Sequence, residues 1–494
     1  MSVRVRYAPS PTGSPHVGNV RTAIFNWLFA RHEGGEFIAR LEDTDRDPAR
    51  YRPESIQDIE TSLNSLGITP DEWWVNKEPS GYVQSERLPF YQAAAQELID
   101  KGHAYPCFCT TERLTQMREE QQSRGVPSGY DRRCRRLSPA DRERYISEGM
   151  QYTVRLAVPL EGKTTYNDLV YGEITFENKL IDDQVLLKSS GWPTYHLAVV
   201  VDDHAMGITH VIRGEDWLPS TPKQILLYQM LGYEQPKWIH APLIVGTDKK
   251  KLGKRHGSTK FVEFIEQGYL PDALFNFLIL CGWSAGDENR ELFTKEEIVE
   301  RFTLQGISKS AAVFDYEKLK WMNGSYIRSY STEKLVALCM PYLVKAGTVS
   351  EPISSETTAY LAQVFPLVAE RMKLLTEAPA LVEFFFNDPT EYEDKGKRKW
   401  LTGEEAQNRI SKAIEVFSNA DGEWTIENAE LATNKVVELT GSERGPIIHT
   451  LRTSITGRTV GPGLFETIAV LGKDCVVRRL HNALAAVTIV ENAE

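Results

Sequence analysis

The first 45 residues constrain the fold more than any other part of the chain. Residues 3–8 alternate between apolar and polar side chains and therefore predict a strand, which ends at the turn sequence "PSPTG". Apolar residues then recur at helical spacing over residues 20–32, Gly34 and Gly35 end the predicted helix, and a second strand follows over residues 37–41. A strand, a turn, a helix and a strand in this order predict a doubly wound α/β domain that binds its ligand at the carboxyl ends of its strands.

Two short segments, about 230 residues apart, have the composition of phosphate-binding loops. The first, "SPTGSPHVGN" at residues 10–19, is a Gly/Pro-rich turn whose histidine precedes a helix, and a helix N-terminus binds phosphate well. The second, "KKLGKRHG" at residues 250–257, is a Lys/Arg/Gly loop that can close over the same phosphates. Together, and in this order, the two segments predict a binding site for ATP.

The overall composition excludes several classes of protein. A chain of 494 residues is too long for one core and predicts two to four domains. No apolar stretch reaches membrane-spanning length, the N-terminus lacks a secretory apolar segment, and six cysteines in so long a chain do not make a disulfide framework. We therefore expect a cytoplasmic protein without a membrane partner. A net charge of −11 argues against indiscriminate nucleic-acid binding, and no DNA partner is expected, although local basic clusters can bind nucleic acid on one face.

The pattern of side chains changes over residues 85–187. Two helical segments, 88–101 and 112–123, are followed by the strand-like runs "YTVRLAV" and "YGEITFE", which indicate a domain inserted between two halves of the nucleotide-binding fold. Residues 197–201 form a continuous apolar run, which predicts a buried strand of a parallel sheet. The later segment "STPKQILLYQMLG" predicts a helix. After residue 330 the chain has helical periodicity with few strand signals, for example in "ETTAYLAQVFPLVAERMKLLTEA".

With these motifs in view, the chain resembles class I aminoacyl-tRNA synthetases. "PHVGN" stands where that family has its HIGH motif, and "KLGKR" stands where it has KMSKS. More narrowly, the chain resembles bacterial-type glutamyl-tRNA synthetases, because it also contains "ARLEDTD", "YHLAVVVDDHAMGITHVIRGEDW", "STPKQILLY", "FDYEKLKWMNGSYI" and "LFETIAVLGKDCVVRRL". The resemblance covers essentially the whole chain. It departs at Gly253, where the family commonly has a serine, so that one hydroxyl donor for phosphate is missing.

The resemblance implies a ligase that activates L-glutamate with ATP and Mg²⁺ and transfers the glutamyl group from its adenylate to the 3′-terminal adenosine of tRNA(Glu). It also implies a monomer. An enzyme that charges tRNA(Gln) as well is an open alternative, because a few anticodon contacts decide between the two tRNAs. A glutaminyl-tRNA synthetase is disfavoured because its C-terminus usually forms β-barrels. A tRNA-modifying glutamyl transferase or a small-molecule adenylyltransferase would lack the long C-terminal half.

Several residues become candidates for ATP binding. His16 and Lys254 are expected to stabilise charge on the departing pyrophosphate, because this reaction depends on positioning and electrostatics. A capping histidine and a surface lysine are the alternative readings of these two side chains. The other candidates shape the phosphate turn or lie in the Lys/Arg/Gly loop: Thr12, Gly18, Asn19, Lys251 and Arg255.

The carboxylates of glutamate call for fork-shaped bidentate donors, which favours arginine over lysine. By resemblance, Arg6 and Arg213 bind the two carboxylates, with Arg213 on the side chain, and Glu42 holds the α-ammonium group. Ser10 and Tyr195 complete the pocket. A structural salt bridge at Arg213 and a capping or metal-facing role for Glu42 are the competing interpretations. An arginine selects glutamate over glutamine because an amide loses the charge pairing and places N–H groups against the guanidinium.

Cysteine spacing gives a second, independent signal. Cys107 and Cys109 are followed 25 positions later by Cys134, and Tyr130 precedes Cys134 by four positions. Three thiolates and one further ligand make a plausible tetrahedral site for a structural Zn²⁺. Some related enzymes have a histidine where this chain has Arg136, and others use a Tyr-x₃-Cys pair, which Tyr130 and Cys134 fit. Three unligated thiols in a reduced protein are the alternative.

Contacts to tRNA are expected from several segments. The helical C-terminal region would read the anticodon, where unstacked bases need arginine or aromatic platforms, and Arg371 matches a family arginine that contacts the anticodon end. An exposed helix arginine without a ligand is the competing interpretation of Arg371. Asp202 and Asp203 are interpreted as helix caps or as contacts to the tRNA end, and not as metal ligands.

The predicted fold class is therefore α/β, with a doubly wound, Rossmann-like catalytic domain, an inserted α/β acceptor-binding domain and an all-α C-terminal anticodon-binding region. Residues 1–85 and 195–245 are expected to form the two halves of the catalytic domain, and residues 86–194 the inserted domain with the zinc site. Residues 246–330 are expected to hold the KLGKR loop and a stem-contact module, and residues 331–494 the helical anticodon-binding domain.

Overall fold

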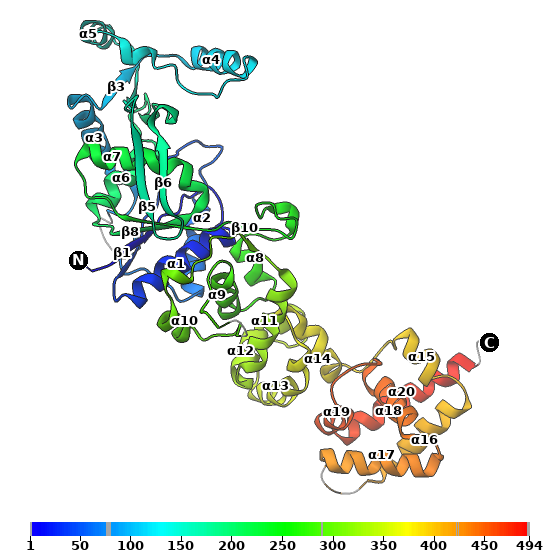
Figure 1. Ribbon diagram of the computed structural model, residues 1–494. Coiled ribbons are helices and arrows are strands. Elements are labelled where there is room, and N and C mark those ends of the chain that lie inside the picture. The colour runs from blue at the N-terminus through cyan, green and yellow to red at the C-terminus, as the bar shows by residue number, and fades with distance from the viewer. Residues whose placement is uncertain (1, 76–80, 288–289, 421, 423, 492–494) are drawn as a thin grey trace. The chain divides into compact units, whose positions relative to one another are not determined.

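The computed structural model describes residues 2–75, 81–287, 290–420, 422 and 424–491. The chain divides into two compact units, which are described separately here. The first comprises Met1–Glu266 with Pro271–Tyr316, and the second comprises Gln267–Leu270 with Glu317–Glu494 (Figure 1). Within the described residues, every helix is too short or too polar to cross a lipid bilayer.

The first unit contains short strands in several small sheets. These strands are β1 (Arg4–Tyr7), β2 (Glu36–Ala39), β3 (Ala104–Cys107), β4 (Thr153–Leu156), β5 (Lys163–Asp168), β6 (Gly172–Glu177), β7 (Val185–Leu187), β8 (His210–Gly214), β9 (Lys237–Ala241), β10 (Ile244–Val245) and β11 (Ala312–Val313). The helices of this unit are α1 (Val17–His32), α2 (Glu54–Ser65), α3 (Leu88–Asp100), α4 (Thr111–Ser123), α5 (Pro139–Ser147), α6 (Tyr195–Ala205), α7 (Thr221–Leu231), α8 (Phe261–Glu266), α9 (Pro271–Leu280) and α10 (Lys295–Arg301). The mixture of helices and strands confirms the predicted α/β class of this part of the chain.

The N-terminal strand, turn, helix and strand form as the sequence predicts. β1 pairs in parallel with β2, with Arg6 opposite Ile38, and α1 connects the two strands. A parallel pair joined by a helix places the carboxyl ends of both strands at one edge of the sheet. The segments "APSPTG" and "EDTD", which follow the two strands, therefore start from the same edge.

A second sheet carries the other half of the nucleotide-binding fold. Its strand order is β6-β5-β9-β8, in which β9 is parallel to both of its neighbours and β5 and β6 form an antiparallel hairpin (Figure 1). β8 lies next to β1, because the Thr209 N–H that precedes β8 donates to the Arg4 carbonyl at 2.9 Å. The β5–β6 hairpin belongs to the segment between the two halves of the nucleotide-binding fold. That segment therefore adds two strands to the sheet that contains β8.

One predicted strand is wrong. Residues 197–201 belong to helix α6, and all residues from Leu197 to Asp203 are buried. A helix that is buried on all sides shows the same continuous apolar run as a buried strand, and periodicity cannot distinguish the two. The helix packs into a core with α3 and α7, and this core also takes in Val154, Leu156 and Tyr166 from the middle segment.

The middle segment also forms a sheet of its own. β3, β4 and β7 are antiparallel, and α4 and α5 belong to the same part of the first unit (Figure 1). A small separate core beside this sheet contains Tyr105, Cys107, Tyr130, Cys134 and Ala157. The buried cysteines of the middle segment therefore belong to a cluster distinct from the main core.

The second unit is helical in its described residues beyond residue 317, as predicted for an all-α region. Its helices are α11 (Tyr316–Ser329, which begins at the boundary), α12 (Thr332–Lys345), α13 (Ser355–Val368), α14 (Ala378–Phe386), α15 (Asp394–Trp400), α16 (Glu404–Ser418), α17 (Ile426–Thr440), α18 (Arg444–Thr456), α19 (Leu464–Leu471) and α20 (Lys473–Glu491). The long helical stretch expected after residue 355 is interrupted at Val368, where short 3₁₀ turns lead into α14. The last helices, yellow to red in Figure 1, bury an apolar core that runs from Leu401 to Val487.

Candidate active site

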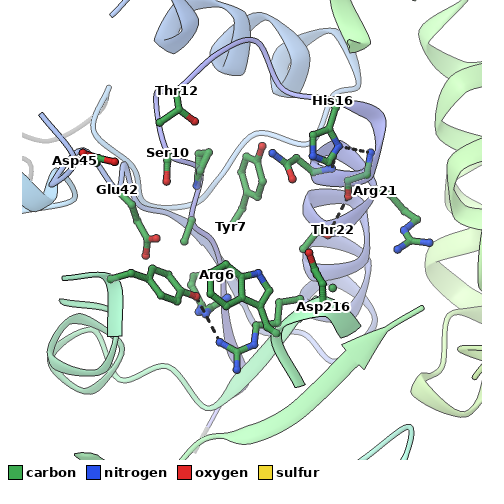
Figure 2. Close-up of a pocket in the computed structure, with 18 of the residues that line it drawn as sticks. Arg6, Tyr7, Ser10, Thr12, His16, Arg21, Thr22, Glu42, Asp45 and Asp216 are labelled. Atoms are coloured by element: carbon green, nitrogen blue, oxygen red, sulfur yellow. Dashed lines mark hydrogen bonds between the residues drawn. The ribbon is translucent and has the colours of Figure 1, made fainter. Parts of the chain in front are cut away.

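A cavity of about 830 Å³ opens in the first unit and collects most of the predicted site residues. Figure 2 shows Ser10, Thr12 and Glu42 on one side of this cavity and His16, Arg21 and Asp216 on the other. The lining residues that the sequence analysis singled out are Arg6, Ser10, Thr12, His16, Gly18, Asn19, Glu42, Tyr195, Arg213 and Lys251. Both phosphate-binding segments and both strand ends therefore meet in one pocket.

His16 caps the helix that opens the phosphate turn. Its Nδ1 accepts the backbone N–H groups of Gly18 at 3.1 Å and Asn19 at 3.2 Å, as an N-cap side chain does. Because Nδ1 is an acceptor, the proton of the neutral ring is on Nε2, which is free to donate. Desolvation, helped by Lys251, lowers the pKa of His16 below 6.5 and keeps the ring neutral. The capping interpretation of His16 is therefore realised, and it leaves one N–H for a ligand.

Gly18 is required at its position by this histidine. A Cβ atom at Gly18 would lie 2.9 Å from Cε1 of the His16 ring, a distance that carbon atoms do not tolerate. The glycine therefore lets the imidazole fold back onto the first turn of α1. In the same turn Gly13 has a φ of 148°, a backbone conformation that favours glycine.

The two phosphate-binding segments are joined by backbone hydrogen bonds. The Val17 N–H donates to the Thr259 carbonyl at 2.8 Å, and the Phe261 N–H donates to the Pro15 carbonyl at 3.0 Å. Thr259 lies two residues after the end of the "KKLGKRHG" segment. The two segments, remote in sequence, are thus held as neighbours by main-chain contacts that no side-chain pattern reveals.

The Lys/Arg/Gly loop reaches the cavity through its first half. Lys251 lines the cavity and pairs with Asp216 at 3.1 Å, and Gly253 also lines it. Arg255 instead pairs with Asp248 at 3.3 Å and is not among the lining residues. The Lys254 backbone belongs to a short 3₁₀ turn, and its side chain lies outside the part of the chain that the structure describes.

One wall of the amino-acid end of the pocket, here called the acidic side, contains a network of buried charges. Arg40 is fully buried and donates to Asp203 at 2.7 Å and to Glu42 at 3.0 Å. Arg6 donates from Nε to both oxygens of Asp203 at 3.2 Å. Although burial opposes charge on Arg40, the carboxylates of Asp203, Asp202 and Glu42 raise the pKa of Arg40 above its ordinary value. The charge of each arginine on this side is therefore matched by protein carboxylates.

The interpretation of Asp202 and Asp203 as helix caps or contacts to the tRNA end is wrong. Both side chains are buried, at 0% and 2% exposure, and neither caps a helix nor is open to a large ligand. Asp202 accepts hydrogen bonds from Gln84 at 2.9 Å, Arg87 at 2.8 Å and Tyr91 at 2.9 Å. A pair of acids in a sequence cannot show which buried donors will surround it, so only the folded chain reveals this network.

Glu42 lies at the edge between this network and the cavity. Its Oε1 accepts from Arg40, and its side chain lines the cavity. Burial raises the pKa of Glu42 above its ordinary value, and the Arg40 guanidinium opposes that rise. A cationic group in the cavity would stabilise the ionised carboxylate.

The opposite wall, here called the neutral side, holds Arg213 differently. This buried guanidinium donates from Nε to His240 Nε2 at 3.0 Å, from Nη1 to Gln224 at 2.8 Å and from Nη2 to Thr221 at 2.7 Å. A weaker contact of 3.5 Å joins Nη1 to the Tyr195 hydroxyl. Among the described residues none of the carboxylates forms an ion pair with Arg213, so the alternative of a structural salt bridge is wrong within that part of the chain.

Among the described residues, this arrangement leaves the buried guanidinium of Arg213 without a carboxylate in direct contact. Burial lowers the pKa of Arg213 below its ordinary value, but an arginine keeps its proton at any pH a protein experiences. Uncompensated buried charge is unfavourable, and a bidentate carboxylate is the group that a guanidinium fork binds best. Arg213 also lies 5.7 Å from the ring of Trp217, which lines the cavity with Tyr195. The neutral side can therefore bind a carboxylate.

Several pocket residues were missed by the sequence analysis. Arg21 is buried and lines the cavity, where it donates to the carbonyls of Cys281 at 2.6 Å and of Pro242. Burial lowers the pKa of Arg21 to about 10. His240 and Asp168 lie behind Arg213, joined by a hydrogen bond of 2.6 Å. The acidic "GED" after β8 could have indicated Asp216, but His240 and Asp168 give no signal in the sequence.

The four predicted metal ligands also come together. The hydroxyl of Tyr130 lies 3.3 Å from Cys107 Sγ and 3.4 Å from Cys109 Sγ, and the thiols of Cys109 and Cys134 are 3.5 Å apart. Among the described residues, Cys107, Cys109 and Cys134 are the His, Cys, Asp or Glu side chains whose ligand atoms lie close enough together to hold a metal ion. Four ligands about 2.3 Å from one zinc ion would be about 3.8 Å from one another, so the donor atoms have the spacing of a tetrahedral site. A hydrogen bond from Cys134 lowers the pKa of Cys107.

Arg371 belongs to the second unit. It is exposed in a short 3₁₀ turn (Ala369–Arg371) after α13, and it donates to the Gly461 carbonyl at 2.6 Å. The residue is therefore not part of a regular helix. A guanidinium has five N–H donors, of which this carbonyl accepts one.

Comparisons with known proteins extend over nearly the whole chain. A family described as "tRNA synthetases class I (E and Q), catalytic domain" matches residues 2–321, and one described as "Anticodon binding domain" matches residues 334–484. A glutamate–tRNA ligase of Moorella thermoacetica is 44% identical over 485 residues, which are 97% of this chain and 98% of that relative. A glutamate–tRNA ligase of Dehalococcoides mccartyi is 47% identical over 491 residues, or 98% and 97% of the two chains.

A solved structure is similar in fold as well. The crystal structure of a glutamate tRNA ligase from Elizabethkingia meningosepticum, in complex with its amino acid, superposes with a TM-score of 0.90. It is 33% identical in sequence and covers 99% of this chain and 100% of its own. The similarity therefore includes both units.

Proposed function

This chain belongs to the glutamate–tRNA ligases, a family of class I tRNA synthetases, and we propose that its cavity binds L-glutamate beside ATP. The family, the fold class and the ATP-dependent ligase activity predicted from sequence are confirmed. The observation that carries the proposal for the pocket is Arg213, a buried guanidinium whose described partners are neutral. These relatives give no support to the alternative enzyme that also charges tRNA(Gln).

The activity of the family joins L-glutamate to tRNA in two steps. The α-carboxylate of glutamate attacks the α-phosphate of ATP, and pyrophosphate leaves. A hydroxyl of the terminal adenosine of the tRNA then attacks the carbonyl carbon of the glutamyl-adenylate, and AMP leaves. Catalysis of the first step consists of positioning the two substrates and stabilising negative charge. When bound with ATP, Mg²⁺ neutralises phosphate charge. The described residues of the pocket lack a cluster of carboxylates that could hold it, so phosphate oxygens would supply its ligands.

His16 is proposed to donate from Nε2 to a phosphate of ATP. Its Nδ1 is occupied by the first turn of α1, which orients the ring and fixes the tautomer. Thr12, Gly18 and Asn19 are proposed to shape the phosphate turn, since all three line the cavity. The cationic residues proposed to bind the phosphates from the loop are Lys251, Lys254 and Arg255, of which Lys251 lines the cavity.

Glutamate is proposed to lie between the acidic and neutral sides. Its side-chain carboxylate would pair with the unsatisfied charge of Arg213, and its α-ammonium would lie at Glu42. Arg6 would bind the α-carboxylate through its terminal nitrogens, because its Nε is used by Asp203. Ser10 and Tyr195 line the same space. Glutamine would leave the positive charge of Arg213 unpaired.

Cys107, Cys109, Tyr130 and Cys134 are proposed to bind one structural Zn²⁺. The spacing of their donor atoms and their enclosure in a small core support this proposal. Zinc content of the purified chain, measured by inductively coupled plasma mass spectrometry, tests it. We expect about one zinc per chain and its loss in Cys134→Ser, while Cys339→Ser, at a buried cysteine of the second unit, keeps the metal. A zinc-free native chain would contradict the proposal.

The remaining roles follow the order of segments expected from the sequence. Residues 86–194 are proposed to bind the acceptor end, residues 246–330 to hold the KLGKR loop and contact the stem, and residues 331–494, with Arg371, to read the anticodon. The enzyme is proposed to act as a monomer in the cytoplasm. Arg371 supports the anticodon role because its guanidinium is exposed and is held in place by a backbone carbonyl.

Exchange of pyrophosphate into ATP tests the assignment of the pocket. We expect exchange that depends on glutamate, is not supported by glutamine, and requires tRNA(Glu). His16→Ala is expected to reduce the exchange by roughly 10²–10³-fold, as the loss of one preorganised donor does elsewhere. The exposed His204→Ala, on α6, is the matched control and is expected to leave it unchanged. Absence of glutamate-dependent exchange with tRNA(Glu) present would contradict the proposal.

A further inference from the structure

Behind Arg213 lies a chain of three buried side chains on three neighbouring strands. Asp168 ends β5, His240 is in β9, and Arg213 is in β8. The parallel register places Arg213 directly opposite His240, and Asp168 opposite Trp238, two residues before His240. Exposure is 1% for Asp168, 0% for His240 and 5% for Arg213. The sheet itself therefore holds the three groups in line.

The hydrogen bonds of this chain fix the tautomer of His240. An arginine Nε–H can only donate, so His240 Nε2, 3.0 Å away, must be the acceptor. The ring proton is then on Nδ1, from which it donates to Asp168 Oδ2 at 2.6 Å. The carboxylate of Asp168 is itself fixed, because its Oδ1 accepts the backbone N–H groups of Val170 and Tyr171, both at 2.9 Å.

The tautomer has a direct consequence for Arg213. His240, Gln224 and Thr221 hold the guanidinium by hydrogen bonds while adding no negative charge. Among the described residues, one N–H of Nη2 has no acceptor, and the second N–H of Nη1 has only the 3.5 Å contact with the Tyr195 hydroxyl. These donors belong to the two terminal nitrogens, which are the pair that binds a carboxylate bidentately.

We propose that Asp168 and His240 are positioning residues that determine amino-acid specificity. They orient Arg213 without neutralising it, so that the carboxylate of the substrate side chain is the anion that completes the site. Neither residue is among those that line the cavity, so each would act on a bound substrate only through Arg213. This inference rests on the proposed function of Arg213, and it assigns a role to the β5–β6 hairpin, which comes from the segment between the two catalytic halves.

Asp168→Asn is the decisive variant. The backbone donors of Val170 and Tyr171 would retain the amide oxygen, which turns the NH₂ group towards His240 Nδ1. His240 Nδ1 would then have to accept, and its proton would move to Nε2, opposite the Arg213 Nε–H. Two donors would face each other, and Arg213 would lose its alignment. We expect KM for glutamate to rise roughly 10- to 100-fold, as loss of one hydrogen bond to a charged group does, with KM for ATP unchanged.

His240→Gln and His240→Leu test the same chain independently. A glutamine can place its Oε1 where Nε2 lies and accept from Arg213, whereas a leucine cannot accept. We therefore expect KM for glutamate to rise more in His240→Leu than in His240→Gln, and the preference for glutamate over glutamine to fall in the same order. His210→Gln is the matched control, because His210 is a buried histidine on β8 that contacts Thr209 and not Arg213.

Aminoacylation with saturating tRNA(Glu), together with thermal unfolding, separates the outcomes. A rise in KM for glutamate alone, graded from His240→Gln to His240→Leu, supports the proposal even if Asp168→Asn fails to fold. Equal changes in KM for glutamate and ATP that follow a loss of stability would show a structural role and overturn it. Unchanged glutamate KM in folded Asp168→Asn and His240→Leu would also overturn it. If wild-type enzyme does not use glutamate at all, the proposed function fails first.

Discussion

The two sides of the amino-acid pocket hold their arginines in opposite ways. Arg6 and Arg213 are buried to the same degree, at 4% and 5% exposure. On the acidic side Arg6 is paired with Asp203, whereas on the neutral side Arg213 has neutral partners among the described residues. The protein thus pairs one arginine with a carboxylate, and the other is the arginine proposed to bind the carboxylate of the substrate side chain. Two identical side chains in one cavity can therefore have a largely structural and a largely ligand-directed role.

This difference has an energetic reason. A buried charge without a partner destabilises the folded chain, whereas a buried charge with its partner is close to neutral for stability. The neutral side therefore carries a free-energy cost that binding of a carboxylate relieves. Sites that bind ligands often hold such locally unfavourable arrangements.

The largest effect is expected from Arg213→Met. The glutamate carboxylate would then lie in a pocket without its partner, and kcat/KM for glutamate is expected to fall by about 1,000-fold or more, or about 4 kcal/mol. Because the variant removes an unpaired buried charge, the unfolding midpoint is expected to stay constant or rise. Steady-state aminoacylation and thermal unfolding measure the two quantities. A clear fall in the unfolding midpoint would show that Arg213 stabilises the folded chain. This result would contradict the difference proposed between the two sides of the pocket.

Asp203→Asn is the corresponding change on the acidic side. It removes a carboxylate that Arg6 and Arg40 share, and it leaves their buried charges undercompensated. We expect the folded state to lose about 3 kcal/mol of stability, measured by denaturant unfolding of the first unit. Asp71→Asn is the matched control, because the Arg31–Asp71 pair is half-exposed and such pairs contribute about 1 kcal/mol or less. Similar stability of both variants would contradict the role given to the network.

Lowering the pH tests the neutral side of the pocket, because it protonates His240 beside Arg213. Burial lowers the pKa of His240 below 6.5, and the groups that face it are Asp168, Arg213, Asp216 and the Thr221 hydroxyl. Protonation would turn Nε2 into a donor against Arg213. KM for glutamate is therefore expected to be constant from pH 8 to 6.5 and to rise only once the pH falls to the lowered pKa of His240, by at most about tenfold per pH unit.

The stability of the folded chain depends on pH in the same direction, because protonation of His240 is also unfavourable for folding. Because the unfolded chain binds a proton near pH 6.5 and the folded His240 does not, stability decreases as the pH falls below 6.5. The substrate carboxyl stays ionised down to about pH 4.3, so it does not produce the rise in KM above that pH. His240→Gln lacks the titrating ring and is expected to abolish the rise. An unchanged pH profile in that variant would assign the titration to another group.

The smallest effect is expected from Gly253→Ser, which leaves both sides of the pocket untouched. A Cβ at this position would meet only the Lys251 carbonyl, at 3.9 Å, so the serine fits without strain. One added hydroxyl donor near phosphate is expected to lower KM for ATP about threefold, as a single neutral hydrogen bond does. KM for glutamate serves as the internal control and is expected to stay constant. A rise in KM for ATP would show that the glycine itself is required.

Much of the pocket could be predicted from the chain because its residues lie in contiguous motifs. "HVGN" contains the cap, the glycine that the cap requires and a lining residue within four positions. Such local arrangements depend on short-range backbone geometry, which the sequence encodes directly. Arg6, Glu42 and Arg213 were found through the resemblance of their motifs to those of a known family. Their ligand roles remain predictions.

The partners of these residues could not be predicted. From the sequence, Asp202 and Asp203 were interpreted as helix caps or contacts to the tRNA end, and residues 197–201 before them as a strand. Their burial in helix α6 follows from packing against α3 and α7, which are distant in sequence. Hydropathy shows that a segment is buried, but it does not show whether a sheet or other helices surround it.

The sequence by itself determined the family, the order of secondary structure at the phosphate turn, and the chemical type of the pocket. Only the tertiary structure decided which arginine is compensated, because that depends on contacts between β5, β9 and β8 and between β1 and α6. Electrostatic energy depends on distances of a few ångströms between groups and on their burial, and neither quantity is a property of a position in the chain. The charge of Arg213 is encoded by one residue, whereas its lack of a protein anion is a property of the fold.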